Sequence, residues 1–488
     1  MNELLTLSGT ELARRIAAKE VSPLEVLEAH ISRIEQVNPD LNAMVEDDFV
    51  RARKTAREQT ERLAHSVSDL PPLFGVPFTV KEMLAYAGMK RTGGSIHHRH
   101  DVMDWDATIL ARMKHAGAIP MGTTNVPELG FWFETYNPIY GRTNNPYDDS
   151  RTCGGSSGGE GALIGAGASP FGLGSDIGGS IRIPAFFCGV FGHKPSRYWL
   201  PLTGHFPYGP GDFANTLLNE KYPFTSVGPL SRRAADLSLL TKIMAGADEH
   251  DRSTLKNIRH GEKPLQWEGR RVLICPNPSF HGARGTDGEL SQVVVNCGKL
   301  FEELGAHVEE LDSRFFVKGT KMWFAALKNS KTKDLHEALM GPEKNLSIGK
   351  ELFKLAMGRP DYTLPNLIVS LSEILGIGSK DLTEELTGLE QMKKDLDEKL
   401  GPDGILILPP HSRVAPKHRA VLWSPFDFIY TGLFTTLGNP ATSVPTGLNP
   451  EGLPLGVQVV ARHGMDHLTL ATAEFLESTF GGWVPPRK

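Results

Sequence analysis

The chain has 488 residues and a formal net charge of −5, and 40% of its residues are hydrophobic and 22% charged. A globular protein of this length can bury a large core. Because the charge is slightly acidic and the basic residues do not cluster, we expect no binding of nucleic acid. No Pro/Ser-rich linker divides the chain, so we expect a single domain over residues 1–488.

Cysteine usage and the N-terminal sequence bear on the compartment. Cys153, Cys188, Cys275 and Cys297 lie far apart with no C-x-x-C motif, which is typical of neither a disulfide framework nor a zinc site. They favour a reducing compartment, and we expect a cytoplasmic protein. We also expect no signal peptide and no transmembrane segment, because no window has about 18 uninterrupted apolar residues.

Residues 1–70 form a predicted N-terminal helical region. Ser8 with Glu11, and Ser22 with Glu25, match the pattern of a capping box at a helix start. Charged residues continue over 44–66, where we also predict a helix. A pair of prolines then ends the region.

From residue 71 onward, short apolar runs bounded by Gly and Pro alternate with helical stretches. Buried strands connected by helices predict an α/β layered fold. The predicted strands are Val76–Val80, Ala118–Met121, Phe171–Gly174, Val272–Cys275, Ile405–Leu408 and Val457–Ala461, and a further one begins at Val308. Residues 287–306 are predicted to be helical. We divide the rest of the chain into a core at 71–250, a mostly helical insertion at 310–400 and a return to the sheet at 401–488.

The segment Thr152–Pro184 is unusually rich in small residues and contains Ser156 and Ser180. Glycine loses much backbone entropy on folding and has no side chain to bury, so a packed core does not call for it. We therefore expect bare backbone N–H groups around a reactive hydroxyl, as in an oxyanion hole. A turn that merely allows close packing stays open as the alternative. A phosphate-binding loop is disfavoured, because G-x-x-x-x-G-K-[ST] is absent.

A serine nucleophile needs a base that removes its proton. His193 follows Ser180 in sequence, but the adjoining Lys194 and Pro195 are typical of a loop, and no G-x-S-x-G motif surrounds Ser180. Lys81 ends an apolar run, and a buried lysine has a lowered pKa that lets it accept a proton. An ordinary solvated lysine remains the alternative.

A histidine cluster at residues 97–101 suggests a metal site at first sight. It lacks the i, i+4 spacing of a helical zinc pair. A solvated loop is favoured, and we expect no metal site.

Together these residues resemble the amidase signature family of serine hydrolases. The matching segments are 75–82, 122–125, 154–160, 174–182, 228–230 and 453–458. The resemblance implies an α/β fold with a mixed, twisted central sheet covered by helices on both faces. Within the family, the fatty-acid amide hydrolases are the most similar in segments 140–148, 184–195, 414–418 and 466–470. Vertebrate members carry an N-terminal membrane helix that we do not expect here.

The resemblance also implies a catalytic Ser–Ser–Lys triad. In that triad Ser180 is the nucleophile, Ser156 the bridging serine and Lys81 the base. The peptide bond between Gly155 and Ser156 is expected to be cis. The implied supporting residues are Ser157, Asp176 and Arg182. The implied oxyanion donors are the N–H groups of Ile177, Gly178, Gly179 and Ser180.

The substrate-binding residues are implied by the same resemblance. The family lines its acyl channel where this chain has Gly130, Phe131, Trp132 and Phe133, although ordinary core aromatics would have the same pattern. The apolar stretch Leu352–Gly376 either caps the pocket or forms a plain helical hairpin. Both segments favour a hydrophobic acyl or aryl group in the substrate.

The function implied by the resemblance is hydrolysis of the C–N bond of non-peptide amides through an acyl-enzyme, with esters and carbamates as further substrates. The implied partner is a small-molecule amide, and no metal or organic cofactor is expected. A homodimer is kept as a hypothesis. Three alternatives stay open: an amidase-like subunit of a tRNA-dependent amidotransferase, a catalytically silent binding protein on the same fold, and a peptidase.

Overall fold

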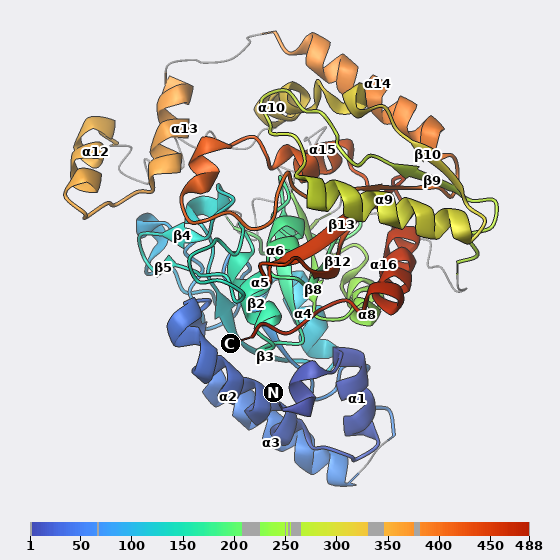
Figure 1. The fold of residues 1–488 in the computed structure, drawn as a ribbon. Coiled ribbons are helices and arrows are strands. Elements are labelled where there is room, and N and C mark those ends of the chain that lie inside the picture. The colour runs from blue at the N-terminus through green and yellow to red at the C-terminus, as the bar shows by residue number, and fades with distance from the viewer. Residues whose placement is uncertain are drawn as a thin grey trace.

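A mixed central sheet runs through the molecule in the computed structural model (Figure 1). The described residues are 2–487 except 66–67, 207–224, 249, 252–253, 255–264, 330–345 and 375–380. Eleven strands form the sheet in the order β1-β3-β2-β6-β8-β7-β12-β13-β11-β9-β10. A separate two-stranded sheet pairs β4 with β5.

The strands of the central sheet are short and largely buried, and each predicted strand overlaps one of them. Their bounds are β1 Met44–Asp47, β2 Pro77–Lys81, β3 Ile119–Thr124, β6 Phe171–Asp176, β7 Phe191–Lys194, β8 Ser226–Ser231, β9 Arg271–Ile274, β10 His307–Glu310, β11 Ile405–Leu408, β12 Ala441–Leu448 and β13 Pro454–Ala461. The small sheet consists of β4 Tyr136–Asn137 and β5 Gly141–Arg142. Strand β2 runs parallel to both β3 and β6, whereas β8, β7, β12 and β13 pair in antiparallel fashion.

Helices pack on both faces of the sheet, as predicted. The helices in the first half of the chain are α1 Gly9–Ala17, α2 Pro23–Leu41, α3 Phe49–His65, α4 Thr108–His115, α5 Gly158–Gly165, α6 Arg182–Phe187 and α8 Ala234–Met244. Further along are α9 Gly288–Glu303, α10 Gly319–Asn329, α12 Ile348–Ala356, α13 Leu364–Ile374, α14 Thr383–Leu400, α15 Ile429–Leu437 and α16 Asp466–Phe480. In Figure 1, α1 to α3 lie at the bottom, and α12 and α13 stand at the upper left.

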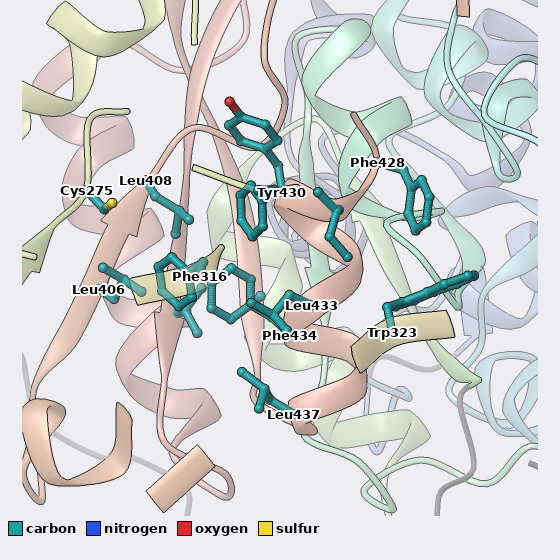
Figure 2. Close-up of a cluster of buried hydrophobic side chains, with 14 of the residues drawn as sticks. Cys275, Phe316, Trp323, Leu406, Leu408, Phe428, Tyr430, Leu433, Phe434 and Leu437 are labelled. Carbon is teal, nitrogen blue, oxygen red and sulfur yellow. The ribbon is translucent and has the colours of Figure 1, made fainter. Parts of the chain in front are cut away.

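Strand β11 shows how the two faces are built. Successive side chains of a strand point to opposite faces of its sheet. Leu406 and Leu408 accordingly belong to a buried cluster with residues of α6, α10, α14 and α15. Ile405 and Ile407 belong to a different cluster, with residues of α8, α9 and α16. Figure 2 shows part of the first cluster, which also contains Phe316, Leu433 and Phe434.

The N-terminal helices begin as the sequence predicts. Ser22 Oγ accepts a hydrogen bond from the Glu25 N–H at 3.2 Å, and Glu25 Oε2 accepts one from the Ser22 N–H at 2.8 Å. Ser8 Oγ accepts from the Glu11 N–H at the start of α1. The helix predicted over 44–66 begins later, because residues 44–47 form the edge strand β1, which pairs with β3.

The prediction of a loop around His193 is wrong. Residues 191–194 form strand β7 in the middle of the sheet, where His193 is fully buried. A strand holding Gly, His and Lys lacks the apolar run by which strands are recognised. One of its polar groups is engaged from a distant part of the chain, since His193 Nδ1 is 2.8 Å from Thr442 Oγ1 of β12.

Helices also occupy the described parts of the predicted insertion, as α10 and α12 to α14. None of the helices among the described residues combines the length and the apolar character needed to cross a membrane. The division of the chain into one domain with four regions stays a prediction.

Leu433→Ala should destabilise the fold. Leu433 of α15 is fully buried in the cluster of Figure 2, and truncating such a leucine costs about 2–5 kcal/mol because the cavity refills incompletely. Leu352→Ala is the matched control, since Leu352 of α12 is 41% exposed. We expect the midpoint of denaturant unfolding to fall for Leu433→Ala and to stay near wild type for the control. Equal midpoints for the two variants would contradict the packing described here.

Candidate active site

Lys81 lies at the carboxyl end of β2, in the interior of the protein. Its neighbours in the sheet, β3 and β6, run parallel to β2. The carboxyl ends of parallel strands meet at one edge of a sheet, where side chains from different strands converge. Ser175 and Asp176 end β6 at that edge. The chain thus delivers an amine, a hydroxyl and a carboxylate to one place.

The Lys81 amine is surrounded by oxygen atoms of serine residues. Its Nζ atom is 2.7 Å from Ser156 Oγ, 2.9 Å from Ser175 Oγ and 3.5 Å from the Ser175 carbonyl oxygen. The Lys81 side chain is fully buried. The alternative of a solvated lysine is therefore wrong, and the structure brings Lys81 and Ser156 together.

Burial lowers the pKa of Lys81 to about 7, although the negative charges of Asp176, Glu160 and Glu82 act in the opposite direction. Removing an ammonium group from water disfavours its charged form. Burial also disfavours the charged form of two of these carboxyl groups, because it raises the pKa of Glu160 to about 8 and that of Glu82 to about 7. Glu160 accepts hydrogen bonds from the hydroxyls of Thr79 and Thr124. Burial therefore favours the neutral form of the Lys81 amine.

Ser156 and Ser157 stand just before α5, and the peptide bond from Gly155 to Ser156 is cis, as expected. The Ser157 hydroxyl donates to the Ser175 carbonyl oxygen at 3.2 Å and accepts from the Ser175 N–H at 3.3 Å. The Ser157 N–H also donates to the Ser180 carbonyl oxygen at 3.1 Å. Ser157 thereby ties the serine loop to β6 and to the segment that carries Ser180.

Ser180 is close to this network through its backbone. Its side chain is nearly buried, with 4% of its surface exposed, as is that of Ser156. Within the described part of the chain, no hydrogen bond joins the Ser180 hydroxyl to Ser156 or to Lys81. The structure therefore forms the link between the amine and Ser156 but leaves the link to Ser180 unmade.

Asp176 organises the loop that leads to Ser180. Its carboxylate receives two hydrogen bonds from the Arg182 guanidinium, at 2.9 and 3.0 Å, and others from the N–H groups of Gly179 and Ile181. Burial opposes the ionisation of Asp176, but Arg182 outweighs it and lowers the Asp176 pKa to about 2. Both side chains are completely buried, so the pair is a rigid internal brace for the loop.

Of the four predicted oxyanion donors, Gly179 is already engaged. Its N–H donates to Asp176 Oδ1 at 2.8 Å, so it does not point freely into the site. Among the described residues, the N–H groups of Ile177, Gly178 and Ser180 have no recorded acceptor. The structure thus leaves three of these groups available and uses the remaining one to shape the loop.

The glycines at the start of α5 are required by packing. A Cβ atom on Gly158 would lie 2.0 Å from Thr135 Oγ1, and one on Gly159 would lie 2.4 Å from the Asn125 N atom. Every residue of α5 is buried. The expectation that a packed core does not call for these glycines is therefore wrong for α5, because the helix fits against its neighbours only without side chains there.

The predicted pocket residues lie around the site in different ways. A Cβ atom on Gly130 would be 3.6 Å from Ser156 Oγ. The Phe133 ring stacks on Phe428, with centroids 4.5 Å apart, and both rings approach the Cβ position of Gly178. Trp132 lies beside Phe133, with ring centroids 6.1 Å apart. An aromatic wall therefore stands beside the loop of N–H groups, and Trp323 packs edge-to-face against Phe428 (Figure 2).

The segment Leu352–Gly376 is connected to the same region. Residues 375 and 376 lie outside the described residues, and the rest covers parts of α12 and α13. Phe131 packs against Tyr362 and Leu367. The buried Glu128 carboxylate accepts hydrogen bonds from the backbone and the hydroxyl of Thr363, both at 2.8 Å. The α12–α13 hairpin is thus fastened to the chain that passes Ser156.

The other histidines singled out in the sequence have structural partners. His193 Nε2 is 3.3 Å from Asp466 Oδ1, and none of its recorded contacts involves Ser180. His98 pairs with Asp101 at 2.7 Å. The described residues contain no group of three or more His, Cys, Asp or Glu side chains that could hold a metal ion.

Three buried residues near the site were missed by the sequence analysis. Ser175 contacts the Lys81 amine, and His205 Nε2 is 2.7 Å from Ser175 Oγ. Lys194 is fully buried, with its amine donating to the Pro195 carbonyl oxygen at 2.7 Å. Ser175 adjoins Asp176 in the matching motif and was open to inference. His205 has no local pattern that marks it.

The chain is similar to known amide hydrolases over nearly its whole length. A family model described as "Amidase" matches residues 25–470. Human fatty-acid amide hydrolase 2 is 40% identical, over 99% of this chain and 91% of its own. The chain belongs to the amidase signature family. The chain described here is also 30% identical to an acylamidase of Rhodococcus erythropolis, over 97% of this chain and 95% of that protein.

The fold is shared as well. The solved structure of 6-aminohexanoate cyclic dimer hydrolase superposes on this amidase with a TM-score of 0.80, covering 99% of both chains at 24% identity. The expected α/β fold, with a mixed sheet between helices, is confirmed.

Arg182→Met should strongly destabilise the amidase. The substitution leaves the Asp176 carboxylate buried without its main partner, and breaking such a buried pair costs about 3–5 kcal/mol. Arg314→Met is the matched control, because the Arg314–Asp312 pair is exposed on both sides. Denaturant unfolding should show a large drop in midpoint for Arg182→Met only. A drop of similar size in both variants would contradict the role of the brace.

Proposed function

We propose that this amidase hydrolyses the C–N bond of non-peptide amides that carry a hydrophobic acyl or aryl group. The observation that carries the proposal is the buried Lys81 amine, whose Nζ atom is 2.7 Å from Ser156 Oγ. A base of this kind can withdraw a proton from a serine hydroxyl without a histidine. In the proposal Lys81 is the base, Ser156 the bridge and Ser180 the nucleophile.

The first stage forms an acyl-enzyme. Ser180 Oγ rotates onto Ser156, since catalytic hydrogen bonds often tighten only in the substrate complex. Neutral Lys81 takes the Ser156 proton while Ser156 takes the Ser180 proton, and Ser180 Oγ forms a bond to the carbonyl carbon. The N–H groups of Ile177, Gly178 and Ser180 stabilise the oxyanion.

Collapse of the intermediate breaks the C–N bond. The proton on Lys81 returns through Ser156 to the leaving nitrogen, which departs as a neutral amine. Water then attacks the acyl-enzyme with the same residues as base and acid, which releases the carboxylic acid and restores Ser180. Positioned proton transfer of this kind contributes about 10²–10⁴-fold to the rate.

The substrate class is supported by the aromatic wall beside the loop. Phe133 and Phe428 present apolar surface next to Gly178, where an acyl group attached to Ser180 would extend. The names of the relatives, a fatty-acid amide hydrolase and an acylamidase, point to the same class. Esters and carbamates present the same carbonyl carbon, so we include them as further substrates.

We propose that the protein acts alone on small amides in the cytoplasm, and a homodimer stays a hypothesis. Activity of the purified chain on a simple acyl or aryl amide separates this proposal from an amidotransferase subunit that needs its complex. Labelling by a fluorophosphonate probe separates it from a silent binding protein. Cleavage of internal peptide bonds would identify a peptidase instead.

Ser180→Ala should abolish turnover of an aryl amide and labelling by a fluorophosphonate, because no other oxygen takes the place of Oγ. Ser478→Ala, at an exposed position on α16, is the control and should behave as wild type. Unfolding midpoints of both variants should match wild type. Undiminished activity of a folded Ser180→Ala variant would remove Ser180 from the mechanism.

The rate should rise with pH and level off once Lys81 has lost its proton. The neutral amine is the active form, and burial lowers its pKa to about 7, so activity is low at pH 5.5 and high at pH 8.5. The measurement is kcat/KM for an uncharged amide across this range. A rate that falls as pH rises through 7 would contradict the assignment.

Two variants identify the group behind the profile. Burial also lowers the pKa of Lys194 to about 7, yet its amine contacts only the Pro195 carbonyl among recorded partners. Lys194→Met should therefore keep the rise near pH 7, whereas Lys81→Met should lose activity. If His193→Gln removed the rise, a Ser–His mechanism would be supported in place of the proposed one.

A further inference from the structure

A chain of hydrogen bonds extends from Lys81 to two buried residues other than Ser156. Lys81 Nζ is 2.9 Å from Ser175 Oγ, and Ser175 Oγ is 2.7 Å from His205 Nε2. The same amine is 2.7 Å from Ser156 Oγ. Ser156, Lys81, Ser175 and His205 therefore form one continuous, buried line of polar atoms.

His205 is fixed in place at the end of this line. Only 2% of its surface is exposed. Its N–H donates to the Leu202 carbonyl at 2.9 Å, and the next N–H, of Phe206, donates to the Met83 carbonyl at 2.7 Å. Met83 is two residues from Lys81 in the chain, so the loop that carries His205 is bonded to the segment that follows the lysine.

Burial favours the neutral form of the His205 ring. Burial, together with the positive charge of Lys81, lowers its pKa to about 3, while the Phe206 backbone opposes this shift. A neutral imidazole has one nitrogen that donates and one that accepts. Nδ1 is buried and has no hydrogen bond of normal geometry among the described residues. The tautomer of His205 is therefore decided by whether Nε2 accepts a hydrogen bond from Ser175 Oγ or donates one to it.

The base role of Lys81 sets that requirement. A neutral amine has two N–H groups and a single lone pair, and the lone pair must face the Ser156 O–H to accept its proton. An N–H group then points at Ser175 Oγ, which acts as acceptor. Ser175 must donate its own proton elsewhere, and His205 Nε2 is the acceptor at hydrogen-bond distance. A protonated Lys81 also donates to Ser175, so the same direction holds throughout the reaction.

The opposite tautomer would disable the base. If His205 Nε2 carried the proton, Ser175 Oγ would accept it, and its own O–H would be free to turn toward the Lys81 lone pair. The Ser156 proton would then have no acceptor on the amine. The tautomer of His205 thus sets the direction of hydrogen-bond donation along the line from His205 to Ser156.

We propose that His205 is a positioning residue, protonated on Nδ1, which acts through Ser175 to keep the Lys81 lone pair directed at Ser156. The inference rests on the proposed Lys81–Ser156–Ser180 mechanism. It adds two residues, Ser175 and His205, to the machinery of that reaction.

Substitutions at His205 test the inference through the acceptor that they keep or remove. The amide oxygen of His205→Gln can accept the Ser175 proton, whereas His205→Leu cannot. We expect kcat of His205→Leu to fall about 10²-fold, as expected for a misaligned catalytic group, with KM within about twofold of wild type because no substrate contact is lost. The kcat of His205→Gln should stay within about threefold of wild type, because the hydrogen bond from Ser175 is kept and the catalytic groups stay aligned.

The pH profile provides a second readout. In His205→Leu the Ser175 O–H donates to the neutral amine, which favours that form, so the midpoint of the profile should move to lower pH. Loss of packing alone would lower activity without this shift. A midpoint that stays in place while kcat falls would overturn the inference.

A double-mutant cycle tests whether His205 acts through Ser175. The variant Ser175→Ala/His205→Leu should be no slower than Ser175→Ala alone, because the first substitution already breaks the line. Losses that multiply would overturn the inference, as would wild-type kcat in His205→Leu or equal losses in His205→Gln and His205→Leu.

A measurement on the unsubstituted protein covers the case in which His205→Leu does not fold. Nitrogen-15 NMR of labelled histidine, assigned with His205→Gln, should show Nε2 without a proton, and a protonated Nε2 would overturn the inference. Failure of the proposed function itself is distinguishable. In that case the wild-type protein does not turn over amides, and the Ser180→Ala variant is still labelled by the fluorophosphonate. Both outcomes are independent of the residue at position 205.

Discussion

The site depends on an amine that is shut away from water and is held by hydroxyl groups. Lys81 is completely buried, and its recorded partners are the oxygen atoms of Ser156 and Ser175. No ion pair to Lys81 is found among the described residues. A direct carboxylate partner would hold the amine in its charged form. The arrangement instead lets the cost of burial prevail, as the proposed role of Lys81 as a base requires.

The nearby acids are kept from Lys81 by donors of their own. The Asp176 carboxylate is engaged by Arg182 and by backbone N–H groups, and Glu82 accepts from the backbone of Thr92 and Gly93. Arg182 is also the first residue of α6. The ion pair therefore joins the end of β6 to the start of α6 and fixes the turn that carries Ser180. Negative charge near the base serves to shape the loop and only partly offsets the burial of the amine.

Sequence patterns predict some of these features and miss others for physical reasons. The apolar run before Lys81 predicts a buried strand that ends in a lysine, and β2 confirms it. The sequence alone does not bring Lys81 to Ser156, since the contact forms between residues far apart in the chain, and only the resemblance to a family predicts it. His193 and His205 show the limit more clearly. In each of these buried histidines a distant partner engages one ring nitrogen, and those partners, Thr442 and Ser175, leave no trace in the local pattern.

The tight fit of α5 has a consequence for how related chains are interpreted. A Cβ atom cannot be added at Gly158 or Gly159 without collision, so any descendant that keeps this local packing must keep glycine there, whether or not it still performs chemistry. A run of glycines therefore identifies the architecture, and it would persist in a relative that has lost its activity. In the proposed mechanism, the atoms that tell a working enzyme from an inert descendant are the Lys81 nitrogen and the hydroxyl oxygens around it, which packing alone does not preserve.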